Sequence, residues 1–366
     1  MILMNDFKAE PAELREAMLC SVARTIDSGW YVLGKAVETF EAEWAAICGV
    51  EHGIGVGNGM DAIELALRAL DIGAGDEVIT TSMTAFATVL AIIRAGATPV
   101  LADIDPNTAL LSMASVHRCI SKKTKAVILV HLYGQIRDMD KWSVFCAEHR
   151  IFLIEDCAQA HLASWGGGCA GSHGIAGAYS FYPTKNLGAL GDGGMLVTKS
   201  SLLKKRVASL RNYGQSERYH HPLFGMNSRL DEIQAAILSE RLEWLNEFTR
   251  RRRTIVAMYS DKIHNPRVKE LVMPQEVDAH VHHLYCITCD GRDELQAFLW
   301  EREIQSLIHY PVPVHHQEPC LSIRRDPEGL TNSEAHASTC LSLPCHPQMT
   351  DADVEHVAES VNAWIE

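Results

Sequence analysis

The sequence SFYPTKNLG at residues 180–188, followed by GDGG at residues 191–194, decides the fold class of this chain. Its single lysine, Lys185, lies among small and uncharged residues, after a proline and before four glycines. The proline stiffens the turn, and the glycines let the backbone come close to a ligand. A nucleophilic lysine needs a lowered pKa, which poor solvation in a tight pocket supplies. Lys185 is therefore a candidate nucleophile, although the same pattern also suits a structural loop.

An acidic residue ends an apolar run upstream of this loop. Asp156 follows residues 151–155, and Gln159 stands three positions later. A buried carboxylate needs a partner, and a protonated pyridine nitrogen is a suitable one because the carboxylate keeps that ring an electron sink. Asp156 is therefore a candidate ligand of a pyridine cofactor.

A glycine-rich segment lies earlier still, at residues 53–59, and precedes a predicted helix at 63–70. Glycines before a helix N-terminus let backbone N–H groups converge on one phosphate. Residues 57–62 also match the dinucleotide pattern G-x-G-x-x-A, with Glu77 at the spacing of a ribose-binding acid. An NAD-dependent dehydrogenase is thus an alternative. Against it, the motif follows two predicted helices, and Glu77 precedes a strand instead of ending one.

The order of these features is more specific than any one of them. A phosphate cradle, a buried Asp156 and an isolated Lys185 describe pyridoxal-phosphate enzymes of the aspartate-aminotransferase fold. The chain resembles the DegT-type nucleotide-sugar aminotransferases nearly from end to end. This resemblance implies an α/β fold of PLP fold type I, with a mostly parallel sheet flanked by helices and a smaller C-terminal α+β domain.

The resemblance also implies which residues hold the cofactor. Lys185 matches the lysine that binds pyridoxal phosphate covalently and carries the proton, and Asp156 matches the partner of the pyridine nitrogen. Asn227 matches a residue that reaches the phosphate of the neighbouring subunit, which implies a homodimer with shared active sites. Phe86 follows Ala85, where the family usually has an aromatic residue, so it either covers the cofactor ring or belongs to the core. The implied cofactor-binding residues are Gly59, Met60, Phe86, Asp156, Gln159, Ser180, Lys185 and Asn227.

The implied reaction is ping-pong transamination from glutamate to a nucleotide-linked ketosugar. The loop at 186–194 resembles that of members acting on a 3-keto sugar, so we expect amination at C3 of a dTDP-linked 3-keto-6-deoxyhexose, within deoxyamino-sugar and glycan biosynthesis. Alternatives are a 4-keto nucleotide sugar as substrate, or a regulator that binds the cofactor without catalysis. A related dehydratase would have histidine at Lys185. The candidate substrate-binding residues are Tyr31, Tyr219, His220, His309 and Tyr310.

Composition limits the partners. The formal charge of −13 argues against nucleic acid or an anionic membrane, and no apolar run reaches the length of a membrane span. Eleven cysteines without a regular framework fit reduced thiols in the cytoplasm. Cys286 and Cys289 form a CxxC on a predicted strand, where they point to opposite faces. We therefore expect no metal site there, nor at the histidines of residues 280–283.

Alternating apolar patterns predict two domains, a large one at 1–250 with an N-terminal helical segment and a small one at 251–366. Helices are expected at 13–26, 37–47, 88–94, 139–149, 202–210, 230–263, 294–302 and 351–365, and strands at 78–81, 99–102, 126–131, 151–154, 195–198, 284–288 and 305–309. Arg250–Arg253 is expected to be an exposed basic turn of the long helix.

Overall fold

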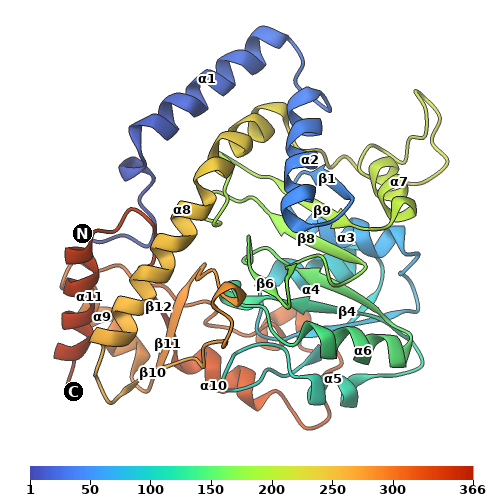
Figure 1. Ribbon diagram of the computed structural model, residues 1–366. Helices are drawn as coiled ribbons and strands as arrows, with labels where there is room; N and C mark the ends of the chain where they lie inside the picture. The colour runs from blue at the N-terminus through green and yellow to red at the C-terminus, as the bar shows by residue number, and fades with distance from the viewer. Residues whose placement is uncertain (366) are drawn as a thin grey trace.

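The computed structural model describes residues 1–365, and its centre is a seven-stranded, mostly parallel sheet (Figure 1). The strand order is β1-β9-β8-β5-β4-β2-β3, in which β9 runs antiparallel to both of its neighbours. The predicted α/β class is therefore confirmed. The strands are β1 (His52–Val56), β2 (Glu77–Thr81), β3 (Thr98–Ala102), β4 (Thr124–Val130), β5 (Phe152–Asp156), β8 (Ala176–Ser180) and β9 (Gly194–Thr198).

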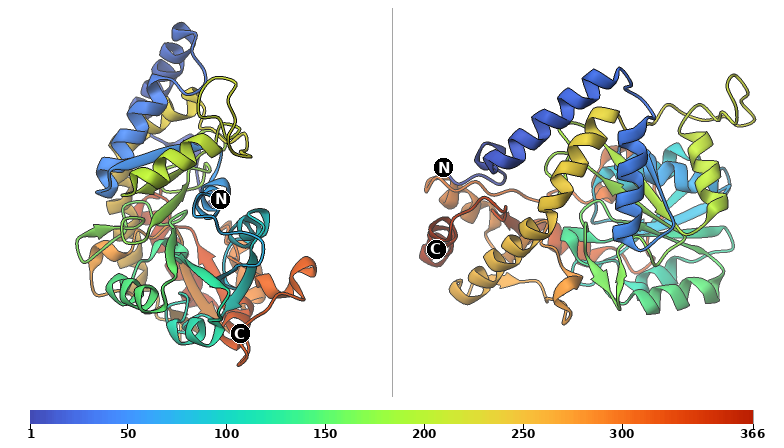
Figure 2. Two further views of the ribbon diagram at one scale, coloured as in Figure 1. Left: turned by 90° about the vertical axis from the view of Figure 1, so that its right-hand side faces the viewer. Right: turned by 45° about the horizontal axis from the view of Figure 1, so that its top comes forward.

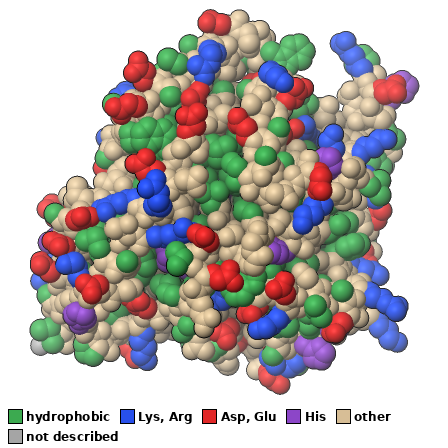
Figure 3. Space-filling view, viewed as in Figure 1, with side chains coloured by type: hydrophobic (Ala, Val, Ile, Leu, Met, Phe, Trp, Pro, Cys, Tyr) green, Lys and Arg blue, Asp and Glu red, His purple; other side chains and the backbone are tan. Residues whose placement is uncertain are grey.

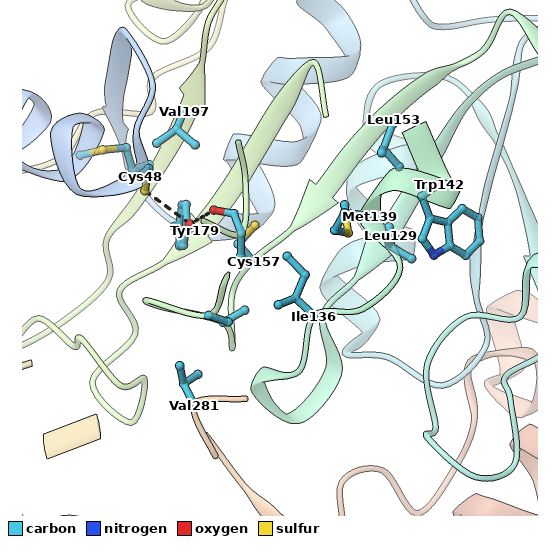
Figure 4. Packing of buried hydrophobic residues seen from close by; sticks show 14 of the residues in the cluster. Cys48, Leu129, Ile136, Met139, Trp142, Leu153, Cys157, Tyr179, Val197 and Val281 are labelled. Atoms are coloured by element: carbon cyan, nitrogen blue, oxygen red, sulfur yellow. Dashed lines mark hydrogen bonds between the residues drawn. The ribbon is translucent and has the colours of Figure 1, made fainter. Parts of the chain in front are cut away.

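Helices cover both faces of this sheet, which is why its strands are apolar on both sides. In β4, Val127 and Leu129 join one hydrophobic core, whereas Ala126 and Ile128 join the other. Figure 4 shows part of the first core, from Trp142 to Cys48. The first core receives α2 (Lys35–Cys48), α5 (Met113–Cys119), α6 (Met139–His149) and part of α8 (Glu232–Lys262), and the second receives α3 (Gly59–Ala69), α4 (Phe86–Arg94) and α7 (Ser201–Leu210).

The 31-residue helix α8 connects the large sheet to a smaller antiparallel sheet of order β10-β11-β12. The predicted domain boundary near 250 falls inside this helix and stays a prediction. The first residues of the chain lie with the small sheet, because Ile2 forms a bridge with Ile304. The small part contains β10 (Val268–Glu270), β11 (Tyr285–Cys289), β12 (Cys340–Leu343), α9 (Arg292–Trp300), α10 (Thr331–Thr339) and α11 (Asp351–Ala363).

The N-terminal helix α1 (Ala12–Ser28) packs along α8, as the right view of Figure 2 shows. Leu14 and Met18 of α1 contact Ile237 of α8, while Leu19 and Ile26 face outward and are exposed. The remaining short elements are the hairpin β6 (Ser164–Trp165) and β7 (Gly168–Cys169), and the 3-10 turns η1 (Phe7–Ala9), η2 (Leu132–Gly134), η3 (Val277–Ala279), η4 (Val314–His316) and η5 (Glu318–Cys320).

Six strands of the structure were not predicted. β1 occupies part of the glycine-rich segment at residues 53–59, and the others are β6, β7, β8, β10 and β12. The strand predicted at 305–309 is wrong: Leu307 makes a single bridge with Ser342, and the chain then leaves the sheet. Cys286 and Cys289 do point to opposite sides of β11, because they join different hydrophobic clusters.

The exposed turn predicted at Arg250–Arg253 is wrong for Arg252, which is 5% exposed. Its Nη1 donates to the carbonyl oxygens of His282 and His283, each at 3.2 Å, and to that of Cys345. Successive residues on a helix are about 100° apart, so four in a row cannot all face solvent on a packed helix. Arg252 therefore ties α8 to the segments that precede β11 and follow β12.

Charged side chains of both signs are mixed over the face seen in Figure 3, so the negative formal charge does not gather there in one patch. No helix among residues 1–365 combines the length and hydropathy that a membrane crossing requires.

Candidate active site

The carboxyl ends of the parallel strands bring the predicted cofactor residues to one edge of the large sheet. Asp156 ends β5, Ser180 ends β8, and the loop after β2 leads to Thr84 and Thr88. Ligands of open α/β sheets bind in the crevice outside the carboxyl ends of the strands. The site is therefore where this fold places ligands.

Asp156 is buried and held by two donors. Thr88 Oγ1 donates to its Oδ2 at 2.8 Å, and the Ala158 N–H donates to its Oδ1 at 3.1 Å. Thr88 is in turn 3.0 Å from Thr84 Oγ1. The carboxylate is thus fixed in orientation, and Lys185 lies close enough for the two charges to interact. Sequence reasoning missed Thr88, because nothing in the helical pattern of residues 88–94 distinguishes a threonine that faces a site.

Lys185 lies in the turn after β8, where its N–H bonds the Tyr182 carbonyl at 2.8 Å. Burial lowers the pKa of the Lys185 amine to about 8, against the attraction of Asp156, which raises it. A half-buried lysine without a hydrogen-bonded partner among the described residues remains partly unprotonated near neutral pH. This is the state that a nucleophilic or basic lysine requires.

Three histidines surround this amine and remain uncharged. Burial, followed by the positive charge of Lys185, lowers the pKa of His161 to about 3 and that of His309 to about 4. The pKa of His283 is lowered for the same two reasons. Neither ring nitrogen of His161 has a hydrogen-bond partner in the described structure, and its ring packs against Trp44 and Phe181. Further positive charge is therefore unfavourable beside Lys185.

Gln159 is clamped beside Asp156. The Tyr133 N–H donates to its Oε1 at 2.6 Å, and its Nε2 donates to the Tyr310 hydroxyl at 3.3 Å. Burial, and then the charge of Asp156, raises the pKa of Tyr310 to about 12. Gly134 permits this arrangement, since a Cβ there would lie 2.7 Å from the Gln159 carbonyl oxygen. Tyr310 and His309, predicted from the resemblance alone, therefore do lie at the site.

The predicted phosphate cradle forms at the first turn of α3. The Asn58 side chain caps the helix through the Asp61 N–H at 2.8 Å, which leaves the N–H groups of Gly59 and Met60 without a recorded acceptor among residues 1–365. A Cβ at Gly59 would lie 2.8 Å from Ser180 Cβ, so the end of β8 lies against this turn. Free N–H groups at a helix N-terminus suit a phosphate group.

Ser228 is a further residue that sequence reasoning missed. Its Oγ accepts from the Gly57 N–H at 2.9 Å and donates to Asp61 Oδ2 at 2.7 Å. It follows Asn227, whose side chain is exposed and has no recorded hydrogen bond in the part of the chain described here. The chain therefore does not bring Asn227 into contact with its own Lys185.

The other predicted substrate residues are exposed and lie on separate elements. Tyr31 follows α1 and is 51% exposed, and Tyr219 is 79% exposed in the loop between α7 and α8 that projects from the body in Figure 1. His220 is exposed in the same loop. Phe86 is 38% exposed at the start of α4 and so does not belong to the core.

The residues present fit pyridoxal phosphate. Among residues 1–365, the buried carboxylate of Asp156 has no cationic hydrogen-bond partner, and a protonated pyridine nitrogen would supply one. The free N–H groups of Gly59 and Met60, with Ser180 beside them, suit its phosphate, and Lys185 suits its aldehyde.

Comparison with known proteins agrees with this arrangement. Residues 12–362 match the model of the DegT/DnrJ/EryC1/StrS aminotransferase family. The chain is 45% identical to dTDP-3-amino-3,6-dideoxy-alpha-D-galactopyranose transaminase from Aneurinibacillus thermoaerophilus, over 96% of this chain and 95% of the relative. It is 42% identical to a "pleiotropic regulatory protein" of Geobacillus stearothermophilus, over 98% and 97%. The crystal structure of S. venezuelae DesV in complex with a ketimine intermediate superposes with a TM-score of 0.95 at 41% identity, over 99% and 98%.

Proposed function

The chain belongs to the DegT/DnrJ/EryC1/StrS aminotransferase family, whose cofactor is pyridoxal phosphate, and we propose that it aminates C3 of a dTDP-linked 3-keto-6-deoxyhexose with glutamate as donor. One arrangement carries the transamination itself: Lys185 lies close enough to the buried carboxylate of Asp156 for the two charges to interact, and burial lowers the pKa of its amine to about 8. A purely structural lysine needs neither property.

Each residue of the site has a separate role in this reaction. When bound, pyridoxal phosphate supplies an electron sink for the carbon that loses its proton. Asp156, oriented by Thr88, would pair with the ring nitrogen. Gln159, held by the Tyr133 N–H, would lie against the cofactor ring.

The phosphate would be held by the N–H groups of Gly59 and Met60 and by the Ser180 hydroxyl. A Cβ at Gly194 would lie 2.3 Å from the Asn58 carbonyl carbon, so the GDGG segment packs directly behind this cradle. The cradle is thereby fixed to the loop that carries Lys185, and cofactor and lysine keep one relative position.

Lys185 both carries the cofactor and moves the proton. With the cofactor bound, its Nζ would hold the aldehyde and would then move the proton that leaves the amino-acid α-carbon. A base with a pKa near the working pH is well matched to such a transfer. Three neighbouring histidines are uncharged, so they add no positive charge that would lower the pKa of Lys185 further. They are His161, His283 and His309.

The choice of C3 rests on the loop at 186–194 and on the relative whose name places its amino group at C3. The test compares kcat/KM for 3-keto and 4-keto dTDP-6-deoxyhexoses with glutamate. We expect a clear preference for the 3-keto sugar; a preference for the 4-keto sugar would contradict the position assigned here while leaving transamination intact.

We also propose a homodimer whose active sites are shared. Its support is the exposure of large apolar side chains around the cofactor residues and on the projecting loop. They are Trp30, Tyr31, Tyr182, Leu190, Tyr219 and Phe224. Asn227, exposed and without a recorded partner among residues 1–365, is the group we expect to reach the neighbouring phosphate.

Subunit mixing tests this shared site. Lys185→Ala and Asn227→Ala proteins, each weak or inactive alone, should regain activity when mixed, because one site of the mixed dimer has both native residues. No recovery, despite exchange demonstrated with labelled subunits, would mean that each chain builds its own site.

A regulator that binds the cofactor without turnover is the second candidate, favoured by the name of the Geobacillus relative. A yellow protein whose cofactor is fixed on Lys185 by borohydride, but which transfers no amine to any ketosugar, would favour it. The cytoplasm is the proposed location, since all eleven cysteines are unpaired thiols.

A further inference from the structure

A cluster of metal-ligating side chains lies outside the residues assigned above. It consists of His315 and His316 at η4 and Glu334 on α10, whose ligand atoms all lie within 4.8 Å of one another. His315 Nε2 is 2.9 Å from Glu334 Oε1, and His316 Nε2 is 3.5 Å from the same oxygen. His315 and His316 therefore both direct Nε2 toward the carboxylate of Glu334.

The first of these imidazoles is fixed in orientation. The His315 side chain is fully buried, and its Nδ1 is 2.6 Å from Ser82 Oγ. The Val314 N–H also bonds the Ser82 carbonyl at 3.0 Å, so η4 is anchored to the loop after β2. Metal-binding histidines commonly have their second ring nitrogen held in this way, which orients the ligating nitrogen.

The spacing of the ligand atoms suits one tetrahedral ion. Donors at about 2.0–2.1 Å from a zinc ion are about 3.3 Å apart in a tetrahedron. The separations of the two Nε2 atoms from Glu334 Oε1, 2.9 and 3.5 Å, lie on either side of this value. The side chains of His316 and Glu334 are 50% and 45% exposed, so an ion can enter from solvent and water can occupy the remaining position.

We propose that His315, His316 and Glu334 bind a divalent ion of the zinc class. Imidazole ligands suit zinc, copper, iron and nickel, and one carboxylate leaves the site with a single negative charge before the ion binds. The ion links η4 to α10, and thus ties down the segment that follows Tyr310.

In a second cluster of the described residues, the ligand atoms of Cys286, His336 and Cys340 also lie within 4.8 Å of one another. There, His336 Nε2 already contacts the Tyr133 hydroxyl at 2.8 Å, and all three residues are buried. It serves as the internal comparison in the test.

Isothermal titration of ZnCl₂ into the holoenzyme, after dialysis against EDTA and then chelator-free buffer, tests the proposal. We expect one ion per chain in the native protein and at least about a tenfold weaker affinity in both His316→Ala and Glu334→Gln. Ser82→Ala, which frees the second nitrogen of His315, should weaken binding by about 10- to 100-fold. His264→Ala removes an exposed histidine elsewhere and should bind as the native protein does.

Circular dichroism of each variant before titration checks that it is folded, and His316→Ala alone decides the outcome if Ser82→Ala does not fold. No binding by the native protein, or equal binding by native and His316→Ala proteins, overturns the proposal. Loss of the ion in Cys286→Ser but not in His316→Ala also overturns it, because the ion then belongs to the other cluster.

Discussion

The pKa of Lys185 offers the most direct test of the site, in the protein freed of cofactor. Its ordinary value is 10.5, and burial brings it to about 8. At pH 7 these values correspond to free-amine fractions of about 0.03% and about 9%, so the site raises the reactive form about 300-fold. The perturbation is Asp156→Asn, which removes the carboxylate that opposes the effect of burial, and the pKa should fall further.

The assay is NMR of the apoprotein after reductive methylation with ¹³C-formaldehyde. The Lys185 signal is identified by its absence from Lys185→Arg. The native signal should titrate near pH 8, and that of Asp156→Asn at lower pH. Asp192→Asn removes an exposed carboxylate from the same loop and should leave the titration unchanged.

The sign follows from the charge of each form. Burial penalises the protonated amine, which lowers the pKa, and a nearby carboxylate stabilises that amine, which raises it. A native signal titrating near 10.5 would refute the reasoning on burial. A higher pKa in Asp156→Asn than in the native protein would refute the assigned role of the carboxylate.

Three other changes test the supporting structure. Thr88→Val removes the 2.8 Å hydrogen bond to Asp156, and a hydrogen bond to a charged group contributes about 1.5–3 kcal/mol. The affinity for the cofactor should therefore fall about 10- to 100-fold in an equilibrium titration of the apoprotein. Unchanged affinity would show that Thr88 does not orient the carboxylate. Arg252→Met leaves the carbonyls of residues 282, 283 and 345 without their donor and should lower Tm by several degrees. Arg250→Met, at an exposed position, should leave Tm near the native value. Equal Tm values for the two variants would contradict a stabilising role for the Arg252 hydrogen bonds. Gly194→Ala should abolish cofactor binding, because the new Cβ would lie 2.3 Å from backbone behind the cradle; native binding measured by absorbance would disprove that close packing.

The sequence alone identifies features that are local along the chain. The glycine-rich turn before α3, the carboxylate at the end of β5 and the lysine in its proline–glycine loop each depend on a few consecutive residues. Helix α6 was predicted with its exact bounds because its apolar residues recur at helical spacing. β8 was missed because Ala176–Ser180 consists mainly of small residues, whose strand state depends on pairing with β5 and β9.

Tertiary structure decides which distant groups meet, because no periodicity encodes a contact between residues far apart in the chain. Thr88 reaches Asp156 across 68 positions, and Ser228 reaches the Gly57 N–H across 171. Arg252 is buried because the segment that precedes β11 packs against one side of α8, which a run of four arginines cannot indicate. The low pKa of Lys185 has the same origin: its loop chemistry is local, but the burial that lowers the pKa comes from the whole fold.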